Sequence, residues 1–282
     1  MDEHFLRVEE HRHDAAGLLY VYPVVSRRAA GLSIGINLNT NRACNWRCVY
    51  CQVENLQRGG PPPVDLARLE AELFGFLGNI VAGDYLMRHV PPECRRLADI
   101  AFSGEGEPTS AAEFAEAVRC VGDVLERYHL LGTLPVRLIT NGSLVHRPKV
   151  RAALAVLAEI GGEAWFKVDR ADPGGRLRVN HSRAATGRVL ANLRLAAGIL
   201  PTWVQTCWFA WQGRPPDAAS REAYLACIRA VADIIKGIHL YGLARPSHQP
   251  EAGDLGRLDA AEMLAWGREI EEKTNVKVIV SP

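Results

Sequence analysis

The sequence lacks an excess of charge of either sign. Its 282 residues include 33 Lys and Arg against 32 Asp and Glu, which leaves a formal net charge of +1 at pH 7 and a pI near 7.7. Proteins that bind nucleic acids usually neutralise several phosphates with clustered basic side chains. The balance weakens a nucleic-acid interpretation without excluding one, and we do not expect tight binding of tRNA.

Long apolar segments are missing as well. The N-terminal stretch MDEHFLRVEEHRH is charged and has no apolar core of the kind that signal peptides contain. No apolar run approaches the roughly 18 residues that a membrane-spanning helix needs. We therefore expect a soluble, cytoplasmic protein without a membrane partner.

Neither an internal repeat nor a convincing linker divides the chain. Hydrophobic residues make up 48% of the sequence, enough for a large core in one α/β domain or in two ordinary ones. We favour a single domain over residues 31–282. An N-terminal extension over residues 1–30 is expected to pack on it.

What the sequence does contain is an alternation of short β-branched runs with amphipathic helical patterns, which is typical of βα units and a parallel sheet. Six main strands are predicted, each followed by a helix, and an extra strand closes the chain. The predicted strands cover residues 32–39, 99–104, 136–142, 164–169, 203–210 and 237–244, and the last is VKVIV. The series predicts an α/β fold of the open or partial-barrel kind, with the chemistry on loops at the C-terminal ends of the strands.

The helix after the second strand is predicted to open with the capping pattern Ser110-x-x-Glu113. Apolar residues at helical spacing predict the other helices: over 66–80, from about 149, over 186–198, over 224–235 and from near 259. The polar stretch RVNHS at 178–182 is compatible with a loop.

Three of the seven cysteines are close together in RACNWRCVYCQ (42–52), where Cys44, Cys48 and Cys51 have the spacing C-x3-C-x2-C. An odd number of cysteines in an intracellular-looking chain favours metal or redox chemistry over a disulfide framework. Structural zinc is almost always closed by four protein ligands. A [4Fe–4S] cluster held by three thiolates keeps one iron free and fits better. The alternative is a zinc or disulfide site with a partner from elsewhere, in a non-catalytic metal-binding protein.

The cysteine spacing, with Tyr50 just before the last cysteine, resembles the cluster motif of the radical S-adenosylmethionine (SAM) superfamily. AFSGEGEPT (101–109) resembles the glycine-rich segment of that family, with Glu105-Gly106-Glu107-Pro108 where two glycines and Glu-Pro are usual. The resemblance implies a partial (βα)6 barrel, a [4Fe–4S] cluster and SAM. It also implies reductive cleavage of SAM to a 5′-deoxyadenosyl radical that abstracts hydrogen from a substrate.

The same resemblance assigns cofactor contacts. Gly106 and Glu107 would bind the amino end of SAM, and Thr140 or Asn141 in ITNGSL (139–144) would lie near the ribose hydroxyls. Asn180 in RVNHS resembles another family position. Each has an ordinary structural alternative: a tight turn before a helix, an Asn-Gly turn or a polar loop.

Further segments resemble a group of stand-alone radical SAM proteins related to the tRNA wyosine-base synthases. They are YVYPVVSRRAAGLSIGINL, VQTCWFAWQG and HLYGLARPS, and the resemblance covers roughly residues 20 to 280. The chain shows no flavodoxin-like domain, second cluster motif or basic tail. We therefore expect an external one-electron donor of flavodoxin or ferredoxin type and a small-molecule substrate. A tRNA-modifying enzyme of wyosine type is the alternative.

Substrate contacts are predicted from the period of two along a strand. In AWFKVD, Lys167 and Asp169 share one face, opposite Phe166 and Val168. Arg245 follows the strand GIHLYGLA. The alternative for each polar residue is an internally bonded group or a surface ion pair.

Two weaker candidates complete the predicted site. Cys207 would share an inward face with Gln205, either as a hydrogen-atom donor or as an inert buried thiol. Ser26-Arg27-Arg28 would bind a carboxylate or phosphate, or would tie down the N-terminal segment.

Overall fold

The computed structural model describes residue 6 and residues 17–26 and 31–282. Its centre is an eight-stranded sheet in the order β1-β2-β5-β6-β7-β8-β10-β12. The strands are β1 (Val21–Ser26), β2 (Gly31–Ile36), β5 (Leu97–Phe102), β6 (Val136–Thr140), β7 (Glu163–Lys167), β8 (Thr202–Cys207), β10 (Ile238–Tyr241) and β12 (Val278–Ser281). From β2 to β12 neighbouring strands are parallel, whereas β1 runs antiparallel to β2 at the edge.

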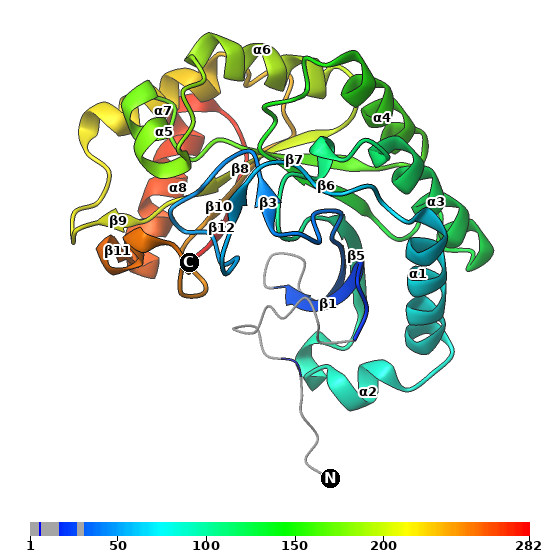
Figure 1. Cartoon of the computed structure of the whole chain (residues 1–282). Coiled ribbons are helices and arrows are strands. Elements are labelled where there is room, and N and C mark those ends of the chain that lie inside the picture. Colours follow the sequence, from blue (N-terminus) through cyan, green and yellow to red (C-terminus); the bar gives the residue numbers. More distant parts are fainter. Residues whose placement is uncertain (1–5, 7–16, 27–30) are drawn as a thin grey trace.

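Helices surround the curled sheet in an arc (Figure 1). They are α1 (Leu66–Val81), α2 (Tyr85–His89), α3 (Phe114–Arg127), α4 (Pro148–Glu159), α5 (Pro173–Asn180), α6 (Thr186–Ala197), α7 (Ala218–Arg229) and α8 (Ala260–Thr274). Each parallel strand from β2 to β10 is followed by a helix, and β12 ends the series. The predicted α/β partial barrel is therefore confirmed.

Short elements lie in the connections. They are the 3₁₀ turns η1 (Pro92–Cys94), η2 (Pro108–Ser110) and η3 (Pro250–Asp254), the strand pair β3 (Ala43–Cys44) and β4 (Gln57–Arg58), and the strand pair β9 (Ala210–Trp211) and β11 (Leu255–Gly256). Two of them, β3 and η2, follow β2 and β5 directly and carry the predicted cysteine and glycine motifs.

The alternation of side chains along β7 separates a packed layer from a cavity. Phe166 and Val168 belong to the hydrophobic core between sheet and helices, whereas Trp165 and Lys167 line a cavity on the inner side of the sheet. This is the period-two arrangement predicted for the segment. No helix among residues 17–26 and 31–282 is long and apolar enough to cross a membrane.

Aspartate caps open several helices. The side chains of Asp65, Asp172, Asp217 and Asp259 each accept a hydrogen bond from the backbone amide three residues on, at the start of α1, α5, α7 and α8. Such caps satisfy amides that have no partner within the helix.

The predicted cap of the helix after the second strand is wrong. That helix, α3, begins at Phe114, and Glu113 makes no side-chain capping bond. The hydroxyl of Ser110 instead donates to the carbonyl oxygen of Glu107 at 2.6 Å, because Pro108 starts the separate turn η2. Residues 178–182 are also only partly a loop, since α5 continues to Asn180.

Candidate functional site

A cavity of about 300 Å³ lies on the inner side of the sheet, at the C-terminal ends of the parallel strands. Its wall includes Cys44, Cys48 and Cys51, which the loop after β2 supplies. The last residues of β7 and β8 and residues that follow β5, β6 and β10 also line it, so segments far apart in sequence meet there. This is where a barrel of parallel strands normally places its chemistry.

The cysteine loop is held by the end of α5 and by residues 247–249. The amide of Val49 donates to the carbonyl of Val179 at 2.8 Å, and the amide of His248 donates to the carbonyl of Cys51 at 3.0 Å. Ser247 Oγ donates to the Val49 carbonyl at 2.6 Å. Gln249 Nε2 donates to the Val53 carbonyl at 3.0 Å. The backbone of the loop is therefore fixed from two sides.

A charged cluster adds a third support. The guanidinium of Arg47 makes a bidentate pair with the carboxylate of Glu251, with N–O distances of 2.6 and 2.8 Å. The same guanidinium lies 2.6 Å from Nε2 of His181, just after α5. Because all three side chains are partly buried, the cluster ties the cysteine loop to η3 and to α5.

Burial raises the pKa of each thiol in the loop. The pKa of Cys44 rises to about 11 and that of Cys48 to about 12, while the Cys51 pKa is raised as well. The charge of Lys167 acts in the opposite direction on all three. Without a bound cation the loop therefore holds neutral thiols, and metal binding must release their protons.

Among the described residues, no three His, Cys, Asp or Glu side chains are grouped so that they could hold a single metal ion. The ligands of a zinc ion must converge in this way. The thiolates of an iron–sulfur cluster bind different iron atoms and need not converge in this way.

The glycine-rich segment packs directly against this loop. A Cβ atom on Gly106 would lie 2.2 Å from the carbonyl oxygen of Ala43 and 2.5 Å from the amide group of Asn39, so only glycine fits there. Gly104 has a φ of +135° and would meet Asn37 in the same way.

Glu107 lies in the wall of the cavity and is buried. Its carboxylate accepts hydrogen bonds from the hydroxyl of Thr109, from the hydroxyl of Thr140 and from the backbone amide of Asn141, at 2.6 to 2.7 Å. Thr140 lies below the cavity surface, whereas Asn141 lines the cavity and donates through Nδ2 to Asn45 at 2.8 Å. The ends of β5 and β6 and the cysteine loop therefore form one bonded unit.

A second buried carboxylate, Asp169, braces the other side of the loop. Its Oδ2 accepts from the hydroxyl of Tyr50 at 2.5 Å and from Nδ2 of Asn180 at 2.7 Å, while its Oδ1 accepts from the backbone amide of Cys207 at 2.8 Å. Asn180 Nδ2 also donates to the sulfur of Cys48 at 3.3 Å. Asp169 therefore lies at the predicted site, but behind the residues that line the cavity and not among them.

The remaining predicted residues line the cavity. Lys167 places its Nζ 4.8 Å from the centroid of the Tyr50 ring. Cys207 is buried, and burial raises the pKa of its thiol well above the ordinary value. Arg245 lies 3.5 Å from Oε1 of Gln52, measured from its Nη1. Ser26 also lines the cavity, and Arg27 and Arg28 lie outside the described residues.

One ionic pair in the cavity wall was not predicted from the sequence. Arg137 on β6 bonds to the carboxylate of Asp99 on β5, which also accepts from Ser33. Both Arg137 and Asp99 alternate with core residues along their strands. The period-two alternation used for β7 would have predicted that they face the cavity, had it been applied to β5 and β6 as well.

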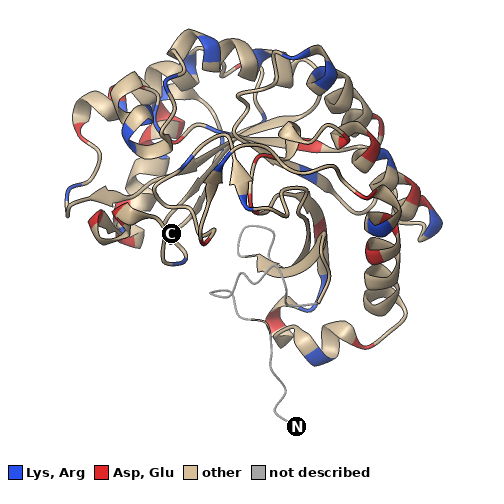
Figure 2. Ribbon diagram, viewed as in Figure 1, with Lys and Arg blue, Asp and Glu red and all other residues tan. Residues whose placement is uncertain are grey.

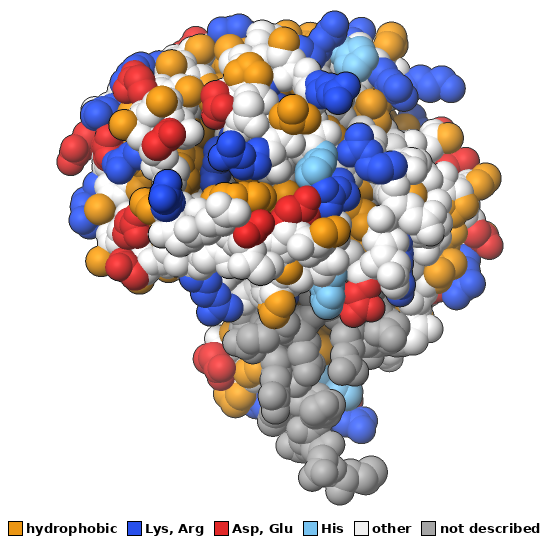
Figure 3. All heavy atoms as spheres, turned by 60° about the vertical axis from the view of Figure 1, so that its left-hand side comes forward, with side chains coloured by type: hydrophobic (Ala, Val, Ile, Leu, Met, Phe, Trp, Pro, Cys, Tyr) orange, Lys and Arg blue, Asp and Glu red, His pale blue; other side chains and the backbone are white. Residues whose placement is uncertain are grey.

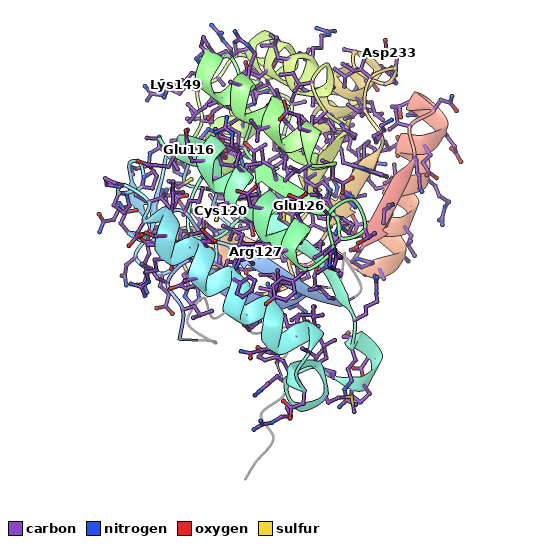
Figure 4. All side chains as sticks on the ribbon, turned by 90° about the vertical axis from the view of Figure 1, so that its right-hand side faces the viewer. Glu116, Cys120, Glu126, Arg127, Lys149 and Asp233 are labelled. Carbon is purple, nitrogen blue, oxygen red and sulfur yellow. The ribbon has the colours of Figure 1, made fainter. Side chains whose placement is uncertain are left out.

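The other cysteines lie elsewhere. Cys94, Cys120 and Cys227 do not line the cavity. Figure 4 shows Cys120 on the outer helical layer, on α3 with Glu116, Glu126 and Arg127. A structural interpretation of these thiols agrees with their positions.

The fold and the loop together define a class of protein: a partial parallel α/β barrel with a three-cysteine loop after its first parallel strand. The fold is similar to that in the crystal structure of a radical SAM methyltransferase from Sphaerobacter thermophilus. The TM-score is 0.60 at 13% identity, with 92% of this chain and 68% of that chain covered. The likeness shows a shared fold.

No family model matches the chain. It is 29% identical over 156 residues to a UPF0026 protein of Methanocaldococcus jannaschii, and 28% identical over 137 residues to the GTPase Obg of Brachyspira hyodysenteriae. These matches cover 53% and 48% of this chain. They span only 40% and 17% of the length of those relatives.

Proposed function

We propose that this protein is a radical SAM enzyme that binds a [4Fe–4S] cluster through Cys44, Cys48 and Cys51 and acts on a small molecule. One observation carries the proposal: the three thiols line the same cavity as Gly106 and Asn141, in a partial barrel. The chemistry that the cluster and SAM supply is reductive cleavage to methionine and a 5′-deoxyadenosyl radical, which takes a hydrogen atom from the substrate.

The residues around the loop suit a cluster. Three thiols face the cavity, and the amide of Asn180 donates to the sulfur of Cys48. Such a bond would orient the thiolate and tune the potential of a bound cluster. The positive charge of Lys167 would help to offset the negative thiolates. The reducing electron would come from an external flavodoxin or ferredoxin.

SAM would lie along the side of the cavity that the ends of β5 and β6 form. The segment at Gly106 approaches the cysteine loop closely, and Glu107 offers a carboxylate to an ammonium group. Two of its present donors are hydroxyls, which can rotate to other acceptors when a stronger donor approaches. Thr140 or Asn141 would bind the ribose hydroxyls, and the ring of Tyr50 would form part of the cavity wall.

The substrate would lie toward β7, β8 and β10. Lys167, Cys207 and Arg245 line that part, with Asp169 directly behind it. Cys207 would be the hydrogen-atom donor if the reaction needs one. A wall with this many apolar and aromatic groups keeps water away from a reactive species.

The test is anaerobic reconstitution followed by assay with SAM and dithionite. We expect about four irons and four sulfides per chain and formation of 5′-deoxyadenosine. Cys44→Ala, Cys48→Ala and Cys51→Ala should each abolish both, while Cys120→Ala on the outer layer should retain both. Stoichiometric zinc without iron, in protein made with ample iron, would contradict the proposal.

A further inference from the structure

The cavity continues below the cysteine loop, toward the N-terminal ends of β5 and β6. Alternate residues of the two strands and of the loops after them line it: Asp99, Ala101 and Ser103, and Arg137, Ile139 and Asn141. Each series is polar at both ends and apolar in the middle. At about 3.3 Å per residue, Asp99 and Arg137 lie about 13 Å along their strands from Ser103 and Asn141. An apolar layer therefore separates this lower polar pair from the side of the cavity assigned to SAM.

The lower pair belongs to a fixed ionic cluster. Nη1 of Arg137 donates to the carboxylate of Asp99, which also accepts from the hydroxyl of Ser33. Nε of Arg137 donates to Glu163 at 2.8 Å. The guanidinium lies over the ring of Trp165, 4.8 Å from its centroid. Because two carboxylates face one guanidinium, the cluster has a formal charge of −1.

The pair still offers donors and acceptors to a ligand. A guanidinium has five N–H donors, and among the described residues only Asp99 and Glu163 accept from Arg137, one bond each. Three of its donors are therefore left over. Each oxygen of Asp99 accepts one bond, although a carboxylate has about four lone-pair sites. Since Arg137 and Asp99 both line the cavity, a ligand there meets donors beside acceptors.

The charge of the cluster selects among ligands. An anion would be attracted by Arg137 but repelled by the two carboxylates beside it, and an ammonium would be repelled by the guanidinium. A neutral group that has an N–H and a C=O on the same edge satisfies both partners without adding charge. Lactams and primary carboxamides are groups of this kind.

We propose that the substrate carries a neutral amide group, a lactam or a primary carboxamide, whose C=O accepts from Arg137 and whose N–H donates to Asp99. This inference rests on the proposed function, because it takes the ligand of the barrel cavity to be the substrate. The amide would be the recognised end of the substrate. An apolar stretch beside Ala101 and Ile139 would connect it to the reacting carbon near the cysteine loop.

The experiment measures binding of four five-membered ring compounds by saturation-transfer NMR, on the reconstituted, oxidised protein with saturating SAM. The probes are 2-pyrrolidinone, cyclopentanone, cyclopentanecarboxylate and pyrrolidine, which is a cation at neutral pH. The lactam should bind about fivefold more tightly than the ketone, because the ketone has no donor for Asp99. The anion and the cation should bind about tenfold or more weakly than the lactam.

Two variants locate the site. Arg137→Gln, with folding checked by circular dichroism, should lose most of the lactam binding. Asp99→Asn removes one negative charge beside Arg137 at nearly constant shape, so cyclopentanecarboxylate should bind about tenfold more tightly than it binds the wild type. A misfolded chain cannot produce such a gain. Asp233→Asn, the same change at an exposed residue labelled in Figure 4, should match the wild type with all four probes.

Three results would overturn the inference: no binding of the lactam, a preference of the wild type for the anion or the cation, or no gain of anion binding by Asp99→Asn. The readouts keep the two proposals apart. If the same preparation forms 5′-deoxyadenosine with dithionite but does not bind the lactam, this inference alone fails. If it binds the lactam as expected but forms no 5′-deoxyadenosine, the proposed function alone fails.

Discussion

At the scale of single residues, Glu107 is a buried carboxylate that donors hold from two sides. Thr109 donates from η2, while Thr140 and Asn141 donate from the end of β6. Burial nevertheless raises the pKa of Glu107, because loss of hydration outweighs these bonds. A group whose pKa is raised by folding favours the folded state at low pH, and that contribution is lost as the pH rises.

We therefore predict a pH-dependent effect of Glu107→Gln. Below the ordinary pKa of 4.5, the two proteins should have similar free energies of unfolding, because Glu107 is neutral in both states. Above that pH the free energy of unfolding of the variant should rise relative to that of the wild type by at most about 1.4 kcal/mol per pH unit. The rise should stop when the carboxyl group of Glu107 ionises in the folded wild type as well.

Urea unfolding between pH 4 and 7 measures this difference. Glu126→Gln, an exposed change on α3, is the matched control and should give no trend. A variant that loses stability against the wild type as the pH rises would show that the donors to Glu107 outweigh its burial.

Site residues that belong to short sequence motifs could be predicted. Residues that reach the site through contacts between distant parts of the sequence could not. The spacing of the cysteines and the segment around Gly106 predicted loops that do line one cavity. Glu251 bonds to Arg47 across 204 positions, and no local pattern marks such a pair. Asp169 was predicted to face inward, but its position behind the wall follows from contacts with Tyr50 and Asn180 that only the fold creates.

At the scale of elements, the βα alternation was readable because each strand and helix buries a periodic apolar face. Two elements lack that signal. The strand β1 contains Pro23, which a sheet accepts at its edge. The helix α5 contains two glycines and little apolar periodicity. It depends instead on the Asp172 cap and on buried Arg176, which donates to the carbonyls of Ala171 and Ala184.

The pair of Arg47 with Glu251 leads to a prediction about the cysteine loop. Glu251→Ala removes charge-assisted hydrogen bonds from a partly buried guanidinium, so local opening of residues 44–51 should become easier by about 1.4 kcal/mol. Hydrogen exchange of those amides should speed up about tenfold. Glu222→Ala, which breaks an exposed pair with Arg229, should leave their exchange unchanged. Equal exchange in the two variants would show that backbone bonds alone hold the loop.

At the scale of the whole molecule, charges of both signs are interspersed. Figure 2 shows basic and acidic residues side by side along the helices of the outer arc. On the face in Figure 3, basic side chains are scattered among acidic and apolar ones. The formal net charge of +1 agrees with this distribution. A groove that follows a nucleic-acid backbone needs a concentrated basic surface instead.

We therefore predict that the full chain does not bind bulk tRNA tightly at near-physiological salt. Filter binding or fluorescence anisotropy over a range of salt concentrations measures this, and weak binding should fall further as salt rises. A sub-micromolar dissociation constant that Arg27→Ala with Arg28→Ala abolishes would instead support a wyosine-type substrate.

Electron paramagnetic resonance of the dithionite-reduced, reconstituted protein, before and after addition of SAM, tests the proposed function most directly. We expect a cluster signal from a chain with three intact thiolates, and a changed signal with SAM, because SAM would bind the iron that no cysteine holds. Cys120→Ala should show both spectra, and Cys48→Ala neither. A full cluster signal that SAM leaves unchanged would show that SAM does not bind the free iron and would contradict the proposed function.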